Sequence, residues 1–294
     1  MIPVAVFAHN EARGILRCLR SFAAGAPGMD LRLYVLCNGN TDGTNDIVAA
    51  YARDNPHVSL IDLALGDKAN AWNVHVHEVA PQADAYVFMD GDCELLADAV
   101  PRMLGTLRAS PAANAVSALP ASGRTVRHWR RQIVEQHALV GGLYALSGSF
   151  VARIRAGKLR LPTGFVGDDS LLGSLAAWDL DPRGDWDAIT RIAICTDAEF
   201  RCDSMSYCSF DDLRRQMRRM ARYSRRRYEM QMINDLLRSA GLAGMPSDTG
   251  ELYRSRGRLC RLAWRGMWTP FDWLALRKIR QRAAFPRADR QSAF

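Results

Sequence analysis

The sequence predicts an α/β protein with a mostly parallel sheet flanked by helices. Strand-like and helix-like stretches alternate four times between residues 2 and 108, and the strand-like runs end in polar or glycine-rich residues. This alternation is typical of a Rossmann-like, doubly wound sheet with right-handed crossover connections. The 294 residues are enough for one large domain with an appended segment.

Each expected strand is a short apolar run that is followed by a helix. The strands are residues 2–8, 31–37, 58–63 and 85–90. The first helix carries Ile15, Leu19 and Phe22 at helical spacing. Thr41 is the expected N-cap of the second helix, because its hydroxyl can accept a backbone hydrogen bond there. The later helices are expected at residues 69–79, 95–108 and 126–140, with a strand at residues 116–119.

Two carboxylates, Asp90 and Asp92, follow the fourth expected strand with Gly91 between them. A buried strand would deliver them to the C-terminal edge of the sheet, where open α/β folds bind their ligands. Two carboxylates suit Mg²⁺ or Mn²⁺, whose other ligands are usually phosphate oxygens and water. The sequence therefore predicts a metal diphosphate site, and a solvated turn is the alternative interpretation.

Several classes of protein are disfavoured by what the sequence lacks. It has no Gly-x-Gly-x-x-Gly or Gly-x-x-x-x-Gly-Lys-Ser/Thr motif, which argues against a dinucleotide oxidoreductase and a P-loop NTPase. We expect no signal peptide and no membrane span, and hence a cytoplasmic protein. Seven cysteines without framework spacing predict reduced thiols. Zinc is not expected, because Cys195, Cys202 and Cys208 lack the paired spacing of a structural site.

Four motifs, in order, resemble those of family 2 glycosyltransferases, which have the GT-A fold. The motifs are Pro3-Val4-Ala5-Val6-Phe7-Ala8-His9-Asn10-Glu11, Val35-Leu36-Cys37-Asn38-Gly39-Asn40-Thr41-Asp42-Gly43-Thr44, Gly66-Asp67-Lys68-Ala69-Asn70-Ala71-Trp72-Asn73 and Asp90-Gly91-Asp92. Four motifs in the right order are more specific than any one of them. The resemblance implies an inverting transferase that uses a nucleotide sugar and Mg²⁺ or Mn²⁺.

The resemblance also implies the residues that bind the donor. Asn38 and the turn of Ala8, Asn10 and Glu11 would cradle uracil and ribose, and Lys68 would approach the base or the diphosphate. From the residue types alone, Asn38 could instead serve a turn and Lys68 could be a solvated surface cation.

The metal motif carries over in the same way. Asp90 would reach the ribose or the metal, and Asp92 would ligate the metal. The chain departs from the family at Cys37-Asn38, where the family often has two acids, so a neutral amide would contact the base.

A second acidic site, Asp168 and Asp169, follows Gly167 and precedes a helical apolar pattern. Adjacent acids can simply begin a helix, where the helix dipole favours them. The resemblance implies that Asp169 is the catalytic base and that Asp168 takes the position of the family's glutamate. Inverting transfer needs both acidic sites, because one carboxylate accepts the proton of the acceptor hydroxyl while a metal neutralises the departing diphosphate. Residues 143–153 resemble the family's small-residue stretch beneath the acceptor, with a buried strand as the alternative.

A long helix is expected from a capping box at Ser209 and Asp212 to about Ser239. Within it, Gln216-Met217-Arg218-Arg219-Met220 is similar to the family's Gln-x-x-Arg-Trp motif, with methionine in place of tryptophan. We expect Gln216, Arg219 and Arg222 to contact the diphosphate or the acceptor. The six arginines within residues 218–227 could contact diphosphate or anionic lipid, and a solvated helical face is the alternative.

The positive charge is concentrated near the C-terminus. Residues 201–290 hold 21 Lys and Arg against 9 Asp and Glu, a net charge of +12, so the other residues carry −4 of the total of +8. Between residues 251 and 282 arginines alternate with large apolar residues, and Pro270 predicts two helices with a break. This composition favours a peripheral helical segment on an anionic membrane surface. The alternative is a pair of helices that pack their tryptophans on the catalytic domain.

We therefore expect an inverting glycosyltransferase that moves a hexose or N-acetylhexosamine from a UDP-sugar to a hydroxyl of a glycan or lipid-linked acceptor at the cytoplasmic membrane face. The expected domains are a catalytic domain at 1–200, with a nucleotide-binding half at 1–92 and an acceptor half at 93–200, and an Arg-rich helical segment at 201–294. The alternatives are a membrane- or nucleic-acid-binding module on an inactive scaffold, and a sugar-nucleotide pyrophosphorylase. No nucleic-acid partner is expected, and the sequence carries no signal of oligomeric state.

Overall fold

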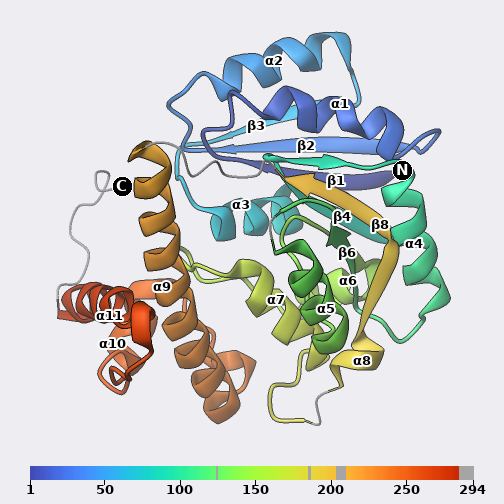
Figure 1. Cartoon of the computed structure of the whole chain (residues 1–294). Helices are drawn as coiled ribbons and strands as arrows, with labels where there is room; N and C mark the ends of the chain where they lie inside the picture. Colours follow the sequence, from blue (N-terminus) through green and yellow to red (C-terminus); the bar gives the residue numbers. More distant parts are fainter. Residues whose placement is uncertain (124, 185–186, 203–209, 285–294) are drawn as a thin grey trace. The chain divides into compact units, whose positions relative to one another are not determined.

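The computed structural model describes residues 1–123, 125–184, 187–202 and 210–284 (Figure 1). The chain forms two compact units. The first unit consists of Met1–Leu159 and Asp168–Ser204, and the second consists of Arg160–Gly167 and Met205–Phe294. The first unit contains the sheet, and the described part of the second is mainly helical.

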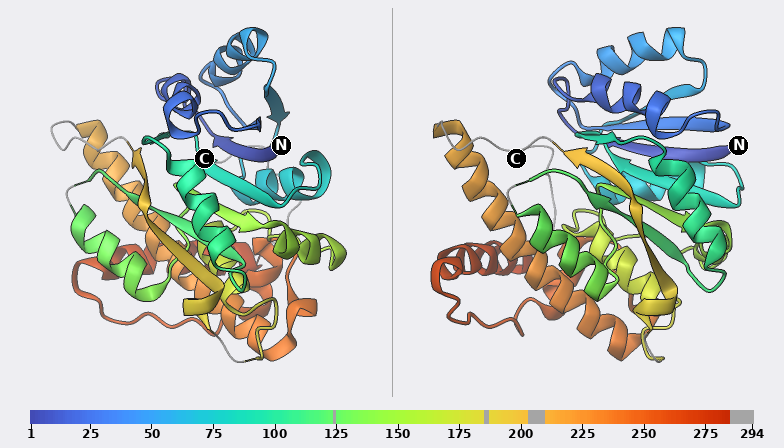
Figure 2. Two further views of the ribbon diagram at one scale, coloured as in Figure 1. Left: turned by 90° about the vertical axis from the view of Figure 1, so that its right-hand side faces the viewer. Right: turned by 45° about the vertical axis from the view of Figure 1, so that its right-hand side comes forward.

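The described residues of the first unit form an eight-stranded sheet in the order β3-β2-β1-β4-β7-β6-β8-β5. Its strands are β1 Ile2–Ala8, β2 Leu31–Asn38, β3 Val58–Leu63, β4 Ala85–Asp90, β5 Cys93–Leu95, β6 Ala115–Pro120, β7 Leu143–Ser147 and β8 Ile192–Cys202. The first four strands pair in parallel, as predicted. β7 runs antiparallel to β4 and β6, and β5 runs antiparallel to β8, the long yellow-orange strand in Figure 2.

The helices of this unit connect or flank the strands. They are α1 Ile15–Gly25, α2 Thr44–Asp54, α3 Lys68–Val74 with a π-helical turn at His75–Val79, α4 Ala99–Ala109, α5 Val126–Gln136, α6 Gly148–Ala156, α7 Asp168–Ala177 and α8 Ala188–Arg191. Around β1 to β3, α1 and α2 cover one face of the sheet and α3 lies on the opposite face (Figure 1).

Three predicted boundaries were wrong, and in the first two a contact outside the local sequence prevails. The helix expected from Leu95 begins at Ala99, since Cys93–Leu95 pairs with β8 as a strand. Thr41 does not cap α2, whose N-cap is Gly43, because the N–H and hydroxyl of Thr41 donate hydrogen bonds to Asn10. α5 ends at Gln136, where the next residue turns into the left-handed region with φ 47°.

Side chains alternate between the two faces of the central strands, as the strand period of two residues requires. Val4 and Val6 of β1 belong to the large apolar cluster that packs against α1 and α4. Phe88 of β4 lies on the other face, stacked on Tyr144 of β7 at 4.8 Å between ring centroids and on Trp72 of α3 at 6.1 Å. This aromatic layer fixes α3 beneath β1 and β4, and α3 begins with a predicted site residue, Lys68.

The second unit is built from three described α-helices, α9 Phe210–Ala240, α10 Thr249–Arg256 and α11 Thr269–Ala284, with short 3₁₀ turns at Leu242–Gly244 and Gly266–Trp268. α9 and α11 lie side by side (Figures 1 and 2). Pro270 lies in the first turn of α11, where proline is compatible with a helix, so the interruption predicted there is the start of α11. Ser209 and the side chain of Asp212 lie outside the described residues, and so does Cys208.

Two carboxylates are fully buried in this unit. Glu229 accepts a hydrogen bond from Arg225 at 2.7 Å and another from the N–H of Val166 at 2.7 Å, and burial raises its pKa. Asp272 pairs with Arg227 at 3.5 Å and with Arg265 at 3.2 Å. Two arginines of the 218–227 cluster, Arg225 and Arg227, thus stabilise the interior of the unit. Among the described residues, no helix has both the length and the apolar character that crossing a membrane requires.

The burial of His75 in the aromatic layer makes the stability of the protein depend on pH. It is fully buried against Tyr34 and Phe88, and burial, with a contribution from Arg155, lowers its pKa to about 3. The unfolded chain therefore binds a proton at this histidine below its ordinary pKa of 6.5 while the folded chain does not. Stability must fall as the pH falls through this window, by about 2 kcal/mol for one histidine near pH 5.

Between about pH 7 and pH 5, the free energy of unfolding of the wild type should fall by about 2 kcal/mol because of His75. His75→Leu should remove this part of the fall. Denaturant titrations at both pH values measure the loss. His128→Leu, which replaces an exposed histidine of α5, is the matched control and should keep the wild-type loss. An identical pH dependence of the unfolding free energy in the wild type and the His75 variant would contradict the lowered pKa of His75.

Candidate active site

The loops that follow β1 and β2 are bound to each other at the C-terminal edge of the sheet. Asn10, in the left-handed region at φ 58°, accepts a hydrogen bond from the N–H of Thr41 at 2.8 Å, and its own N–H donates to Asn40 at 2.6 Å. The N–H of Glu11 donates to the hydroxyl of Thr44 at 2.9 Å. Asparagine tolerates the left-handed conformation better than most residues, which explains its place in this turn.

Asp42 strengthens this connection. It accepts hydrogen bonds from Thr44 and from the N–H of Ala12, at 2.6 and 3.0 Å. Partial burial acts to raise the pKa of Asp42, but these hydrogen bonds lower it. The loops therefore form a defined rim beside the ends of β1 and β2.

Asn38, the last residue of β2, is buried with 3% of its surface exposed. Its side-chain amide nitrogen donates to the carbonyl oxygens of Ala8 at 3.1 Å and of Leu36 at 3.3 Å, while its backbone carbonyl oxygen contacts Nδ1 of His9 at 2.6 Å. The amide group thus joins the ends of β1 and β2. The turn role does not describe this position, because Asn38 is the last residue of a strand and is buried.

The turn between Asp90 and Asp92 requires glycine. The N–H of Gly91 donates to the carbonyl oxygen of Phe7 at 2.8 Å, and a Cβ atom on Gly91 would lie 2.8 Å from the same oxygen. This close approach to β1 presents Asp90, partly buried, at the end of β4 and leaves Asp92 exposed before β5. The sequence motif therefore corresponds to a tight turn at the edge of the sheet.

Lys68 connects acidic residues that are far apart in the sequence. Its Nζ lies 2.5 Å from Oδ1 of Asp90 and 3.4 Å from Oδ2 of Asp168. It is the first residue of α3, whose N-cap Asp67 accepts the N–H groups of Ala69 and Asn70. A capped helix start on the aromatic layer thus holds the ammonium group among the carboxylates.

The charges of this cluster shift one another's pKa values. Burial acts to lower the pKa of Lys68, but the carboxylates of Asp168, Asp90 and Asp169 raise it above its ordinary value. Burial raises the pKa of Asp90 to about 6, although Lys68 opposes that rise. Lys68 is therefore a permanent cation that partly offsets the mutual repulsion of the acids.

Asp169 lies at the start of α7 and is held by backbone groups. Its Oδ1 accepts the N–H of Ser170 at 2.7 Å, and its Oδ2 accepts the N–H of Gly141 at 3.3 Å. A Cβ atom on Gly141 would lie 3.2 Å from Oδ2 of Asp169 and 3.3 Å from Nζ of Lys68. Gly141 therefore approaches both groups closely, and a side chain at this position would crowd them.

Tyr144 belongs to this site but was not predicted as a site residue. Its ring is fully buried beneath Phe88, and among the described residues its hydroxyl has no hydrogen-bond partner. Burial raises the pKa of Tyr144, Lys68 opposes that effect, and Asp168 adds to it. Residues 143–153, which resemble the family's small-residue stretch, form β7 and most of α6. No local signal distinguishes Tyr144 from other buried tyrosines of a strand.

The structure brings part of the predicted site together. Lys68 meets Asp90 and Asp168, and Asp169 shares the space beside Gly141 with Lys68. The residues of the neighbouring rim are Ala8, Asn10, Glu11 and Asn38. Gln216, Arg219 and Arg222 belong to α9 in the second unit, where Arg219 donates to the hydroxyl of Tyr223 at 2.8 Å.

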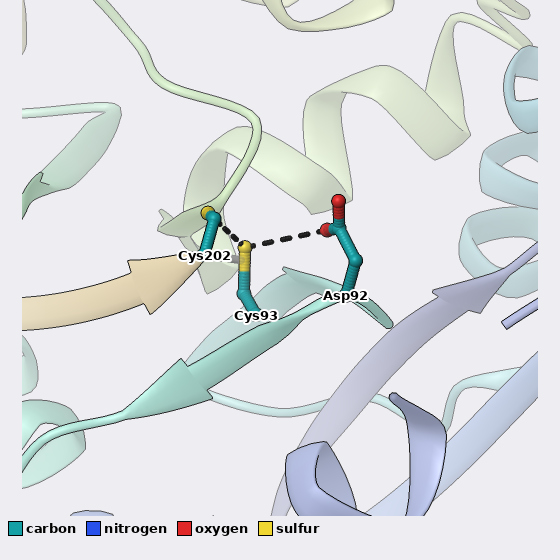
Figure 3. A group of neighbouring side chains, drawn as sticks. All are labelled: Asp92, Cys93 and Cys202. Carbon is teal, nitrogen blue, oxygen red and sulfur yellow. Dashed lines mark hydrogen bonds between the residues drawn. The ribbon is translucent and has the colours of Figure 1, made fainter. Parts of the chain in front are cut away.

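The residues at the turn suit a hard divalent cation. Asp90 and Asp92 offer carboxylate oxygens, the ligands that Mg²⁺ and Mn²⁺ prefer. Asp92 also belongs to a group with Cys93 and Cys202 whose potential ligand atoms all lie within 4.8 Å of one another (Figure 3). The sulfur atoms are softer ligands than a diphosphate-binding metal requires.

The sheet order and the acidic edge are those of an α/β protein that binds its ligand at the C-terminal ends of the strands. A family model described as glycosyl transferase family 2 matches residues 4–164, more than half of the chain. The chain therefore belongs to glycosyl transferase family 2. The match contains Asn38, Lys68, Asp90 and Asp92 and ends just before Asp168. No curated protein matches the chain.

Solved structures with the same fold are distant in sequence. Mannosyltransferase PcManGT from Pyrobaculum calidifontis, in complex with GDP-Man and Mn²⁺, has a TM-score of 0.61 and 18% identity, over 94% of this chain and 74% of that one. S. aureus TarS 1-349 with UDP-GlcNAc has a TM-score of 0.52 and 15% identity, over 96% and 81%. Glucosyl-3-phosphoglycerate synthase from Mycobacterium tuberculosis, with phosphoglyceric acid, has a TM-score of 0.50 and 20% identity, over 72% and 74%.

Proposed function

We propose that the protein is an inverting glycosyltransferase that moves a hexose or N-acetylhexosamine from a UDP-sugar to a hydroxyl of a glycan or lipid-linked acceptor. The observation that carries this proposal is the cluster of Lys68, Asp90, Asp168 and Asp169 at the edge where β1, β2 and β4 end. This arrangement combines a cation for phosphate with carboxylates for a metal and for proton transfer.

The rim beside this cluster is proposed to bind the nucleoside of the donor. Ala8, Asn10 and Glu11 would line the uracil and ribose, with Asn38 at the back of the site. Because the amide nitrogen of Asn38 already donates to Ala8 and Leu36, we assign to Asn38 mainly the positioning of this rim. Support for a nucleotide sugar comes from PcManGT and TarS, whose structures contain GDP-Man and UDP-GlcNAc.

Asp90 and Asp92 are proposed to hold Mg²⁺ or Mn²⁺. The metal would supply positive charge that stabilises the departing diphosphate. Lys68 adds a permanent charge next to Asp90, and Asp168 keeps the ammonium group in place from the other side. Gln216, Arg219 and Arg222 are proposed to contact the diphosphate or the acceptor from α9.

Asp169 is proposed as the base that accepts the proton of the acceptor hydroxyl. The N–H groups of Ser170 and Gly141 hold one oxygen each, which orients the carboxylate. The acceptor hydroxyl would approach Oδ2 of Asp169 beside Gly141. A fixed base of this kind contributes typically a factor of about 10² to 10⁴ to the rate.

We expect Asp169→Asn to lower the turnover of sugar transfer by about 10² or more while UDP binding stays close to wild type, since the amide keeps the shape but cannot accept the proton. Transfer is measured as UDP release, and binding by calorimetry. Asp197→Asn, at an exposed carboxylate of β8, is the matched control and should transfer normally. Transfer by the Asp169 variant within a factor of about three of wild type would exclude this base.

The acceptor is proposed to lie at the cytoplasmic face of an anionic membrane, to which the second unit binds peripherally. One hollow of this unit, the Trp264 surface, is lined by the exposed apolar side chains of Leu262, Trp264, Met267 and Trp273. Leu259 and Leu274 are exposed as well. Trp264 is 84% exposed and Met267 76% exposed, which does not fit tryptophans packed in a core.

Arginines accompany the apolar side chains of the Trp264 surface. Arg277 lies over the ring of Trp273 at 5.6 Å, whereas Arg265, over the ring of Trp268 at 5.8 Å, is paired with the buried Asp272. Exposed tryptophan beside arginine suits the interface of an anionic bilayer, where the ring reaches the headgroup level and the cation meets lipid phosphate. The net charge of +12 over residues 201–290 adds a long-range attraction.

The combined substitutions Trp264→Ser and Met267→Ser should weaken flotation of the protein with phosphatidylglycerol vesicles, because they remove the most exposed apolar area of the surface. Trp129→Ser, at an exposed tryptophan of α5, is the control and should float like wild type. The wild type should not float with pure phosphatidylcholine vesicles. Equal flotation of the wild type and the double variant would refute this membrane surface.

A further inference from the structure

Two cysteines meet beside Asp92, on strands that are distant in the sequence. Cys93 of β5 is the direct partner of Cys202 in the antiparallel pairing with β8. Their sulfur atoms are 2.6 Å apart, and the Sγ of Cys93 donates a hydrogen bond to Oδ1 of Asp92 at 3.5 Å (Figure 3). The described cysteines are free thiols, so this contact is between two reduced groups.

The sulfur distance favours a covalent bond over a shared metal ion. A disulfide has a sulfur–sulfur length of about 2.05 Å, so its formation requires only about half an ångström of approach. Two thiolates on tetrahedral zinc, each at about 2.3 Å from the metal, lie about 3.8 Å apart, so a zinc ion would have to separate the sulfur atoms. Directly paired residues of antiparallel strands also have a Cα separation of about 4.5 to 5.5 Å, within the range that disulfides span.

We propose that Cys93 and Cys202 are a modification site, at which a reversible disulfide forms and alters the metal-binding carboxylate of Asp92. The effect on Asp92 rests on the proposed function, whereas the formation of the disulfide does not. The oxidant is a small disulfide such as oxidised glutathione, and a small thiol reverses the reaction.

The burial of the two thiols sets the order of the steps. Cys93 is 1% exposed, whereas Cys202 is partly exposed and can reach a dissolved oxidant. The thiolate of Cys202 attacks one sulfur of oxidised glutathione, which forms a mixed disulfide and releases one glutathione thiolate. Cys93, deprotonated in the second step, then attacks the Cys202 sulfur, forms the protein disulfide and releases the second glutathione. Two thiols are oxidised and one glutathione disulfide is reduced.

Oxidation changes the surroundings of Asp92 directly. The thiol hydrogen that Cys93 donates to Oδ1 of Asp92 is lost, and the Cys93 sulfur is bound to β8. Asp92 is exposed and adjoins Cys93 in the chain, so its carboxylate loses a contact that orients it. We therefore expect the oxidised protein to bind UDP with Mn²⁺ several-fold more weakly than the reduced protein, since supporting contacts tune metal affinity by about tenfold or more.

The experiment equilibrates the full chain in buffers of increasing ratios of oxidised to reduced glutathione. Free thiols are then blocked, and a non-reducing peptide map identifies the crosslink. The expected product joins the peptides of Cys93 and Cys202, and dithiothreitol removes it. Cys93→Ser and Cys202→Ser should each abolish the crosslink, whereas Cys195→Ser, at a buried thiol of the same strand β8, should leave it intact.

The outcomes separate the disulfide from the proposed function. Persistence of both thiols at every glutathione ratio, or their protection by tightly bound zinc, would overturn the modification site. A crosslink that leaves the calorimetric affinity for UDP with Mn²⁺ unchanged would overturn its effect on Asp92. If the reduced protein binds no nucleotide while the crosslink still forms, the proposed function fails and the disulfide stands.

Discussion

The ion pairs of Lys68 connect the parts of the site on which the function depends. Asp90 comes from the end of β4 and Asp168 from the start of α7, and both meet one ammonium group. Without that cation, carboxylates packed at the same edge would repel one another, and their protonation would rise. The position of Lys68 depends in turn on the cap of α3 and on the stacking of Trp72 against Phe88. The aromatic layer beneath the sheet therefore determines where the charges lie.

Features encoded in short stretches could be predicted from the sequence. The first four strands and the turn at Asp90-Gly91-Asp92 follow from local patterns, and the family resemblance predicts that Lys68 and Asp169 are site residues. Features that depend on a distant partner could not be predicted. Leu95 was expected to begin a helix, but Cys93–Leu95 forms a strand because β8 lies beside it. Tyr144 joins the site because β7 lies antiparallel to β4, a pairing that no local motif encodes.

In the second unit, the sequence alone does not show which arginines have buried partners. From composition, every arginine of residues 218–227 was a candidate for phosphate or lipid. In the structure, Arg225 pairs with Glu229 and Arg227 pairs with Asp272, and both carboxylates are buried in the second unit. A buried carboxylate that loses its cation is strongly destabilising, so these arginines serve the fold first. We therefore assign the proposed membrane binding to the exposed apolar side chains of the Trp264 surface rather than to these arginines.

The most direct test of the central claim, a metal-dependent donor site at Asp90 and Asp92, is a calorimetric titration of the full chain with UDP, with and without MnCl₂. We expect Mn²⁺ to tighten UDP binding by about tenfold or more, equivalent to about 1.4 kcal/mol, and Asp92→Asn to remove most of this gain. UDP binding that is equally tight without metal, or a gain that the Asp92 variant retains in full, would contradict a metal site at these carboxylates.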